Sequence, residues 1–258
     1  MKSPLRKRLP RELKSEFGKY LVVFIMMAIT IGFVSGFLVA DGSMLRAYDD
    51  SFQKYNIEDG YFQTKKKLTP AQKEDIEKSD VKVYENFYIE QKLTNGSTIR
   101  FFKNRKEVDK VCLMNGKMPK KSGEIAVDRM YADNNELKVG DTVKSRKKTF
   151  RITGLVALSD YSALFQNNND TMFDAVKFGV AIVTDKDFEA LNQVKVQYNY
   201  AWIYDKKPAT EKKEKKMAED LMEDMADVVT IESFVPQYQN QSIHFTGDDM
   251  GSDRAMIV

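Results

Sequence analysis

The longest uninterrupted apolar run lies near the start of the chain. Residues 20–40 read YLVVFIMMAITIGFVSGFLVA, a stretch without a charged side chain that is bounded by Lys19 and Asp41. A helix of this length rises about 30 Å, which matches the hydrocarbon core of a bilayer. A soluble core helix rarely lacks charge over such a distance. The pattern therefore predicts a transmembrane helix over residues 20–40.

A cleaved signal peptide is the main alternative, since it also combines a basic start with an apolar stretch. Its apolar region spans only about 7–15 residues and ends in a small-x-small cleavage motif. Here the run is longer, and Leu38-Val39-Ala40 places a large leucine where a small residue belongs. These features favour an uncleaved membrane anchor.

Small residues recur every fourth position within this run, at Ala28, Gly32, Gly36 and Ala40. This spacing places them along one stripe of a helix, and Gly32 with Gly36 forms a GxxxG pair. Such stripes let a second membrane helix approach closely, although small residues are common enough in spans to align by chance. We predict that the stripe is a helix-packing face for other spans.

The first nineteen residues are strongly basic. They contain seven Lys or Arg and two Glu, a net charge of +5, whereas the whole chain has 41 basic and 38 acidic residues. Residues 1–19 are predicted to form a cytoplasmic, basic interfacial helix, with a solvated flank as the alternative. Because positive segments stay in the cytoplasm, residues 41–250 are predicted to form an extracytoplasmic domain.

After residue 41 the apolar residues recur in short segments, some with the spacing of a helix and others with the alternation of a strand. Thr69 and Pro70 predict a helix start, with Thr69 as N-cap. Alternation on both sides of Asn95-Gly96 predicts a hairpin with a type I′ turn. Strands are predicted over residues 149–156, 178–183, 196–204 and 228–234, with a helix over 209–225. The predicted fold class is α+β: one N-terminal transmembrane helix followed by a mixed α+β extracytoplasmic domain.

Composition excludes several classes of function. Residues 20–258 carry 34 basic and 36 acidic side chains, which argues against nucleic acid as a partner. One Cys and one His exclude a disulfide framework and a Cys/His zinc site. The P-loop, GxGxxG, HExxH and GxSxG motifs do not occur. We therefore predict no catalytic, cofactor-binding or metal-binding residues, and no enzyme. The run QNNND at 166–170 is predicted to be a mobile loop.

One segment resembles a known family. Residues 116–143 read GKMPKKSGEIAVDRMYADNNELKVGDTV, and the strand-like KTFRITGLV follows shortly afterwards. This is similar to a segment of FtsX-like, MacB-type ABC transporter permeases. The matched structural positions include Gly116, Pro119, Gly123, Glu124, Ile125, Gly140 and Asp141. Gly123 and Gly140 are predicted at turns, and Ile125 is predicted to alternate inward with Val127 along a strand.

The resemblance implies a fold of the MacB-like periplasmic core type and a role in the plasma membrane of a bacterium. Such a permease subunit transmits ATP-driven motion from a separate ABC ATP-binding subunit, for export of a peptide, lipoprotein or drug. It implies a homodimer or a heterodimer with another permease. Permeases of the family have three further spans, so residues 251–258 are expected to begin a second span, and the chain resembles an N-terminal fragment. The alternative is a membrane-anchored regulator or binding module, such as a cell-wall hydrolase activator or a peptide sensor, without transport.

Overall fold

The computed structural model describes residues 14–145, 148–191 and 195–245. The chain divides into two compact units, Met1–Asp49 and Asp50–Val258. Most of the predicted interfacial helix, and all of the segment 251–258 that was expected to begin a second span, lie outside the described residues.

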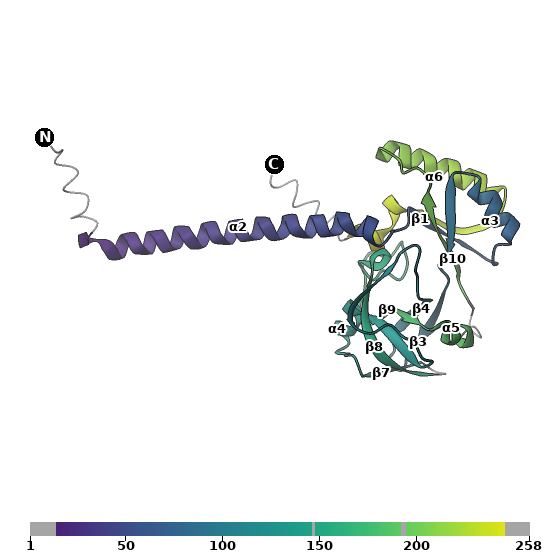
Figure 1. Cartoon of the computed structure of the whole chain (residues 1–258), viewed down its shortest axis with the longest axis horizontal. Helices are drawn as coiled ribbons and strands as arrows, with labels where there is room; N and C mark the ends of the chain where they lie inside the picture. Colours follow the sequence, from purple (N-terminus) through teal and green to yellow (C-terminus); the bar gives the residue numbers. More distant parts are fainter. Residues whose placement is uncertain (1–13, 146–147, 192–194, 246–258) are drawn as a thin grey trace. The chain divides into compact units, whose positions relative to one another are not determined.

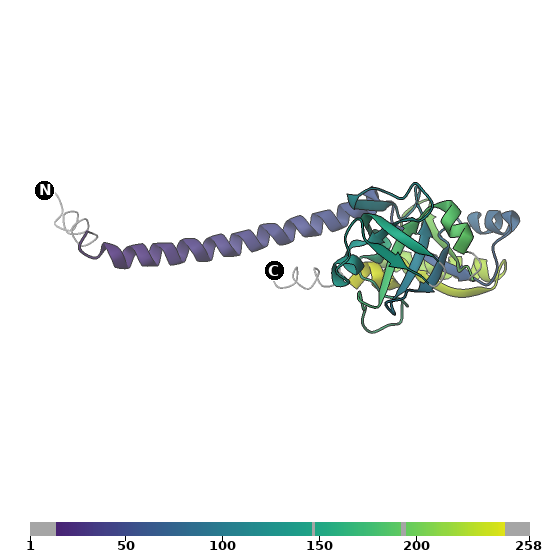
Figure 2. The ribbon, with the colours of Figure 1, turned by 90° about the horizontal axis from the view of Figure 1, so that it is seen from below.

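The apolar run forms part of one long helix, α2 (Phe17–Lys54). This helix is continuous in both views (Figure 1, Figure 2). Residues Phe17–Ala40 are long and apolar enough to cross a membrane, and none of their side chains is buried. The Thr30 hydroxyl donates to the Met26 carbonyl at 2.8 Å, so a polar group within this stretch is satisfied by its own helix. The helical pattern continues past Ala40 for a further fourteen residues.

A small antiparallel sheet contains both early and late strands of the second unit. Its order is β11-β1-β10-β2. The bounds are β1 (Gly60–Thr64), β2 (Val81–Glu85), β10 (Tyr198–Tyr204) and β11 (Ile231–Pro236). Phe62, Tyr200 and Trp202 form an aromatic core on one face, and α3 (Pro70–Glu77) and α6 (Glu211–Ala226) contribute Ile76, Leu221 and Met225 to it. The ribbon of Figure 1 shows both helices beside β1 and β10. The opposite face of this sheet is therefore free of helices from this core.

The predicted helix starts are confirmed. Thr69 and Gln72 form a reciprocal capping box at the start of α3, with Pro70 in the first turn. This arrangement satisfies backbone N–H groups that have no partner within the helix. The helix predicted over 209–225 is α6, and the Thr210 side chain accepts a hydrogen bond from the Lys213 backbone N–H.

The strands of a larger mixed sheet come between β2 and β10 in the sequence. Its order is β3-β4-β9-β6-β8-β5, with β7 paired to β8. The pairs β4–β9 and β6–β8 are parallel, and the other pairs are antiparallel. The strands are β3 (Tyr88–Lys92), β4 (Thr98–Lys103), β5 (Val111–Gly116), β6 (Glu124–Asp128), β7 (Thr142–Lys144), β8 (Thr149–Leu158) and β9 (Phe178–Val183). The helices α4 (Arg129–Asn134) and α5 (Asp185–Leu191) follow β6 and β9.

The strand predicted at Ile125 and Val127 is β6, and both side chains are buried as predicted. Ala126 between them is fully buried as well, so the strand has no solvent-facing side. It lies between β8 and β9, and Tyr131 of α4 belongs to the same core. Strands covered on both faces read as continuous apolar runs, and EIAV is such a run.

The hairpin around Asn95 is confirmed, but its turn type is not. Strands β3 and β4 pair antiparallel, and the Leu93 N–H donates to the Ser97 carbonyl at 2.8 Å. Three residues, 94–96, therefore connect Leu93 to Ser97. Gly96 has φ +89°, whereas Asn95 is not among the residues with positive φ. A type I′ turn needs positive φ at both central residues, so Asn-Gly here is part of a three-residue loop.

The two sheets have separate hydrophobic cores that meet at shared aromatic residues. Phe87 and Tyr198 pack against both clusters. The mixed α+β fold class is therefore confirmed, and one compact unit holds two cores.

Candidate binding pocket

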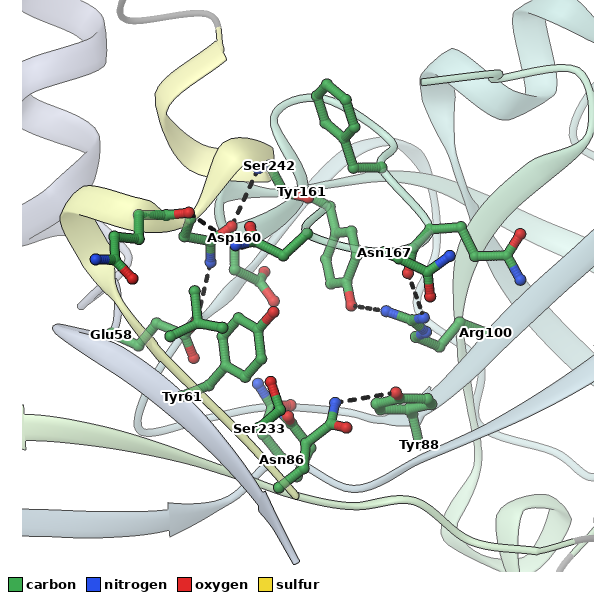
Figure 3. Close-up of a pocket in the computed structure, with 18 of the residues that line it drawn as sticks. Glu58, Tyr61, Asn86, Tyr88, Arg100, Asp160, Tyr161, Asn167, Ser233 and Ser242 are labelled. Carbon is green, nitrogen blue, oxygen red and sulfur yellow. Dashed lines mark hydrogen bonds between the residues drawn. The ribbon is translucent and has the colours of Figure 1, made fainter. Parts of the chain in front are cut away.

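A polar pocket of about 360 Å³ lies between the face of the small sheet that is opposite α3 and α6 and the edge of the large sheet. Its walls come from β1, β3, β4, β10 and β11, from the chain between residues 160 and 169, and from residues 239–242 (Figure 3). Nine of the lining side chains are amides, with tyrosines and serines among the rest. The amides are Gln63, Asn86, Gln166, Asn167, Asn168, Asn169, Asn199, Gln239 and Asn240.

Three neighbouring strands present a row of neutral polar side chains to the pocket. Gln63 of β1 pairs directly with Asn199 of β10 on one side and with Ser233 of β11 on the other. Alternation explains this placement, since Phe62 and Tyr200 point to the helix-covered face and their neighbours point to the pocket. Asn199 is buried, and its side-chain carbonyl oxygen has no hydrogen-bond partner among the described residues.

Three tyrosines surround the centre of the pocket. Tyr61, Tyr88 and Tyr161 come from β1, β3 and the turn after β8, and Figure 3 shows their rings around one space. The Gln63 amide donates to the Tyr88 hydroxyl at 3.2 Å. Burial raises the pKa of Tyr61 and of Tyr161, so both phenols remain protonated donors at neutral pH.

The single basic residue of the pocket lining is held by internal partners. Arg100 Nε donates to Glu90 at 2.9 Å, Nη1 donates to the Tyr161 hydroxyl at 2.6 Å, and Nη2 donates to the Gln166 carbonyl at 2.8 Å. Its guanidinium also stacks 4.1 Å from the centre of the Tyr88 ring. These contacts fix the planar group in place and use its donors.

Glu58 and Asp160 line another wall of the pocket and belong to a cluster of acidic side chains. Arg105 makes a bidentate pair with Asp160, at 2.6 and 2.7 Å, and both side chains are buried. Asp109 lies 3.9 Å from Arg105 and accepts the Glu58 backbone N–H at 2.9 Å. Burial, together with Asp109 and Asp160, raises the pKa of Glu58 well above its usual range. The surroundings of Glu58 therefore favour its protonated form.

The predicted mobile loop is tied to a distant part of the chain. Asn168 donates from its side chain to the Gln239 carbonyl and accepts the Gln241 backbone N–H, both at 2.9 Å. Within the loop, Asp170 accepts the Asn167 N–H at 2.8 Å. The loop at 166–170 is therefore a wall of the pocket, held by residues about seventy positions later in the sequence.

Residues 237–243 also contact the segment that follows α2. Asn240 donates from its amide to Glu58 Oε1 at 3.3 Å, and the Gln237 side chain donates to the Glu58 carbonyl at 2.5 Å. On the other side, the Ser162 hydroxyl donates to the Ser242 carbonyl at 2.6 Å. Glu58 is thus the point where the chain entering the second unit meets its last described segment.

The structural motif predicted from the sequence lies away from this pocket. Gly116 ends β5, Pro119 follows it, Gly123 precedes β6, Glu124 and Ile125 belong to β6, and Gly140 and Asp141 precede β7. The motif residues do not line the pocket among the described residues. Glu124 accepts the backbone N–H groups of Lys120 and Lys121, and Asp141 accepts that of Lys138. Their carboxylates therefore stabilise turns.

The four small residues Ala28, Gly32, Gly36 and Ala40 all lie on α2 with exposed side-chain positions. Space around Gly32 and Gly36 is open, with no atom within 4 Å of an added Cβ. Their role in helix packing stays a prediction. In the described part of the chain, no group of three or more His, Cys, Asp or Glu is arranged to hold a metal ion.

Only one sequence feature points to the pocket. The run QNNND supplies four of its lining residues, yet the composition of a loop does not reveal where that loop is held. The other lining residues are spread from Glu58 to Ser242. Their convergence depends on the pairing of β1 with β10 and β11, which local periodicity does not specify.

The mixed α+β domain with its N-terminal apolar helix was compared with known proteins. No family model and no curated protein matches the chain. Among solved structures, it is similar to the periplasmic region of MacB from Actinobacillus actinomycetemcomitans, with 13% identity and a TM-score of 0.37, over 67% of this chain and 87% of that one. It is also similar to the extracellular domain of the noncanonic ABC-type transporter YknZ from Gram-positive bacteria, with 12% identity and a TM-score of 0.34, over 67% and 98% of the two chains.

Proposed function

We propose that this chain is part of the permease subunit of an ABC-type transporter of the FtsX-like, MacB type. In this proposal α2 anchors it in the plasma membrane, and the unit that begins at Asp50 works outside the cytoplasm. A separate ATP-binding subunit supplies the motion, and the extracytoplasmic unit transmits it to an exported peptide, lipoprotein or drug.

The observation that carries the proposal is the structure of the motif segment. Gly116, Gly123 and Gly140 all have left-handed backbones, with φ of +75°, +89° and +107°. Side chains are strained in this region, so the backbone favours glycine at these positions. An added Cβ at Gly116 would also lie 2.3 Å from the Thr153 carbonyl oxygen. The conformation of these three positions thus agrees with a structural role for the motif glycines, and at Gly116 a larger residue would also clash.

The same segment is fastened to one strand, β8. The Lys117 N–H donates to the Thr153 carbonyl, the Arg151 N–H to the Gly123 carbonyl, and the Gly140 N–H to the Ile152 carbonyl, each at 2.8 Å. Three separate motif turns therefore contact consecutive residues of β8. This compact arrangement supports reading the segment as one inherited structural block.

The partner is tested by isolating the tagged chain from membranes of its own organism after crosslinking in cells. The expected result is enrichment of a protein with a Walker A motif and an ABC signature, relative to a tagged unrelated single-span anchor of equal abundance. Enrichment equal to that of the control anchor would refute coupling to an ATP-binding subunit.

The orientation is tested by cysteine labelling. In a Cys112→Ser background, Lys212→Cys places a thiol on the exposed side of α6, and Lys7→Cys is the matched control in the basic N-terminal segment. A membrane-impermeant maleimide should label the first variant in intact cells and the second only after permeabilisation. The reverse pattern would place the domain in the cytoplasm and overturn the proposal.

The pocket favours a second candidate, a membrane-anchored binding module without transport. Its walls include Glu58, just after α2, and residues 239–242, so an occupant would contact both segments at once. The two candidates differ in their dependence on ATP hydrolysis. A transporter loses its cellular phenotype when the partner's ATPase activity is removed, whereas a binding module that acts alone retains it.

A further inference from the structure

Two of the charged groups that line the pocket are paired with internal partners. Arg100 is engaged by Glu90, Tyr161 and the Gln166 carbonyl. Asp160 forms its bidentate pair with Arg105. A charged ligand that displaced either partner would leave a buried charge unpaired at high cost. Glu58 is buried beside other carboxyl groups, and its Oε2 has no hydrogen-bond partner among the described residues.

Most of the other polar groups of the lining are amides and hydroxyls. The Asn199 side-chain oxygen is buried without a partner, and it lies in the row that also contains Gln63 and Ser233. Amides and hydroxyls each offer both donors and acceptors. A ligand that complements this row must therefore be neutral and must also both donate and accept hydrogen bonds.

The tyrosines add flat apolar surface to these polar groups. Tyr61 and Tyr88 present rings together with hydroxyls, a combination that gives contact area at little cost in conformational entropy (Figure 3). Only four lining residues are wholly apolar: Phe102, Phe165, Phe234 and Val235. The lining thus suits a ligand with many hydroxyls and apolar C–H faces better than a peptide with large apolar side chains.

We propose that this pocket binds a neutral carbohydrate. Sugar hydroxyls match the Ser233–Gln63–Asn199 row, and the C–H face of a sugar ring matches the tyrosines. The volume of about 360 Å³ falls at the lower end of the usual range for ligand sites. The inference goes beyond the proposed function, because it concerns the chain alone and holds with or without an ATP-binding partner.

Binding is measured by isothermal titration calorimetry on the full chain in nanodiscs, without any ATPase. The probes are maltotetraose and tetra-N-acetylchitotetraose as neutral oligosaccharides, tetraalanine capped at both ends as a neutral peptide, and trilysine as a charged ligand. We expect at least one oligosaccharide to bind, and the peptide and trilysine to bind more weakly or not at all. Binding of neither oligosaccharide at millimolar concentration, or preference for the capped peptide, would overturn the proposal.

The site is located with a conservative double variant, Tyr61→Phe with Ser233→Ala. Each change removes one hydroxyl and keeps the rest of the side chain, so we expect affinity to fall about tenfold for the two lost hydrogen bonds. The matched control is Tyr84→Phe, because Tyr84 and Tyr61 both pair with Ala201 in the same sheet but only Tyr61 lines this pocket. Equal affinity in the double variant and the control would refute this location.

A second measurement on the unmodified chain keeps the location testable if the double variant loses its fold. Hydrogen exchange followed by mass spectrometry should show slower exchange in β1 and β11 when the binding oligosaccharide is present. Protection confined to other segments would place the ligand elsewhere and refute the assignment to this pocket.

Discussion

Replacing Asp128 by Asn should change how the stability of the second unit depends on pH. Asp128 is the N-cap of α4, where its carboxylate accepts the Tyr131 N–H at 3.1 Å, and its side chain is buried. Burial raises its pKa from 3.8 to about 6. Asn is an equally good N-cap and carries no charge, so the substitution separates the cap from the ionisation.

The magnitude follows from the difference between the two pKa values. A shift from 3.8 to about 6 corresponds to about 3 kcal/mol at 1.36 kcal/mol per pKa unit. Below about pH 4 the folded and unfolded states both hold the proton, so there is no penalty. Between about pH 4 and 6 only the folded state keeps it, so stability falls as pH rises, and the loss is complete above about pH 6.

The assay is urea unfolding of residues 50–258 at pH 4 and at pH 7.5, followed by circular dichroism and by fluorescence of the single tryptophan, Trp202. This unit contains all buried hydrophobic residues of the described chain, so its unfolding reports on both cores. Asp128→Asn should gain about 2.5 kcal/mol relative to the unaltered protein on going from pH 4 to 7.5, because part of the penalty is already present at pH 4. Any effect of the new amide that is the same at both pH values cancels when the free energies of unfolding at the two pH values are subtracted.

The matched control is Asp133→Asn, on the same helix but with a side chain that is 58% exposed. It should show no comparable dependence on pH. If the stability of Asp128→Asn depends on pH as that of the unaltered protein does, burial of this carboxyl does not limit stability at neutral pH. The same conclusion follows if the control changes as much as Asp128→Asn.

Three further experiments test the packing and the membrane helix. Gly116→Ala should lower the free energy of unfolding by several kcal/mol because its Cβ would meet the Thr153 oxygen, whereas Gly96→Ala, in open space, should cost only about 1 kcal/mol; urea unfolding compares them. Arg105→Met leaves Asp160 buried without its bidentate partner and should cost about 3–5 kcal/mol in the same assay. Changing Gly32 and Gly36 together to Ile should weaken association of the span in a membrane two-hybrid assay, and unchanged association would refute the packing stripe.

Local chemistry was enough to predict most elements of the fold. Thr69 and Pro70 predicted the start of α3, and the apolar run at Phe178–Val183 coincides with β9. These features depend on contacts between close neighbours in sequence. The turn at Asn95 shows the limit, since Asn-Gly is compatible with more than one loop length and the pairing of Leu93 with Ser97 decides between them.

Local sequence patterns could not predict that the strands divide between two sheets. Strand β2 ends at Glu85 and β3 begins at Tyr88, yet the first pairs with β10 and the second with β4. Nothing in the short connection shows that the chain changes sheets there. The pocket lies at this division, which is why residue patterns indicated the scaffold but not the site.

The charge arrangement explains how so polar a cavity is compatible with a stable fold. Arg100 and Arg105 each bind a carboxylate, and burial beside other carboxyl groups raises the pKa of Glu58 and favours its uncharged form. The same pairing removes the charged groups from ligand recognition and leaves it to amides, hydroxyls and tyrosine rings. If pH rises until Glu58 ionises, its charge faces Asp109 and Asp160, and the contact from Asn240 then joins the last described segment to a destabilised wall. Stability should therefore fall as pH rises above the ordinary pKa of a glutamate carboxyl, because only the folded state keeps the Glu58 proton there.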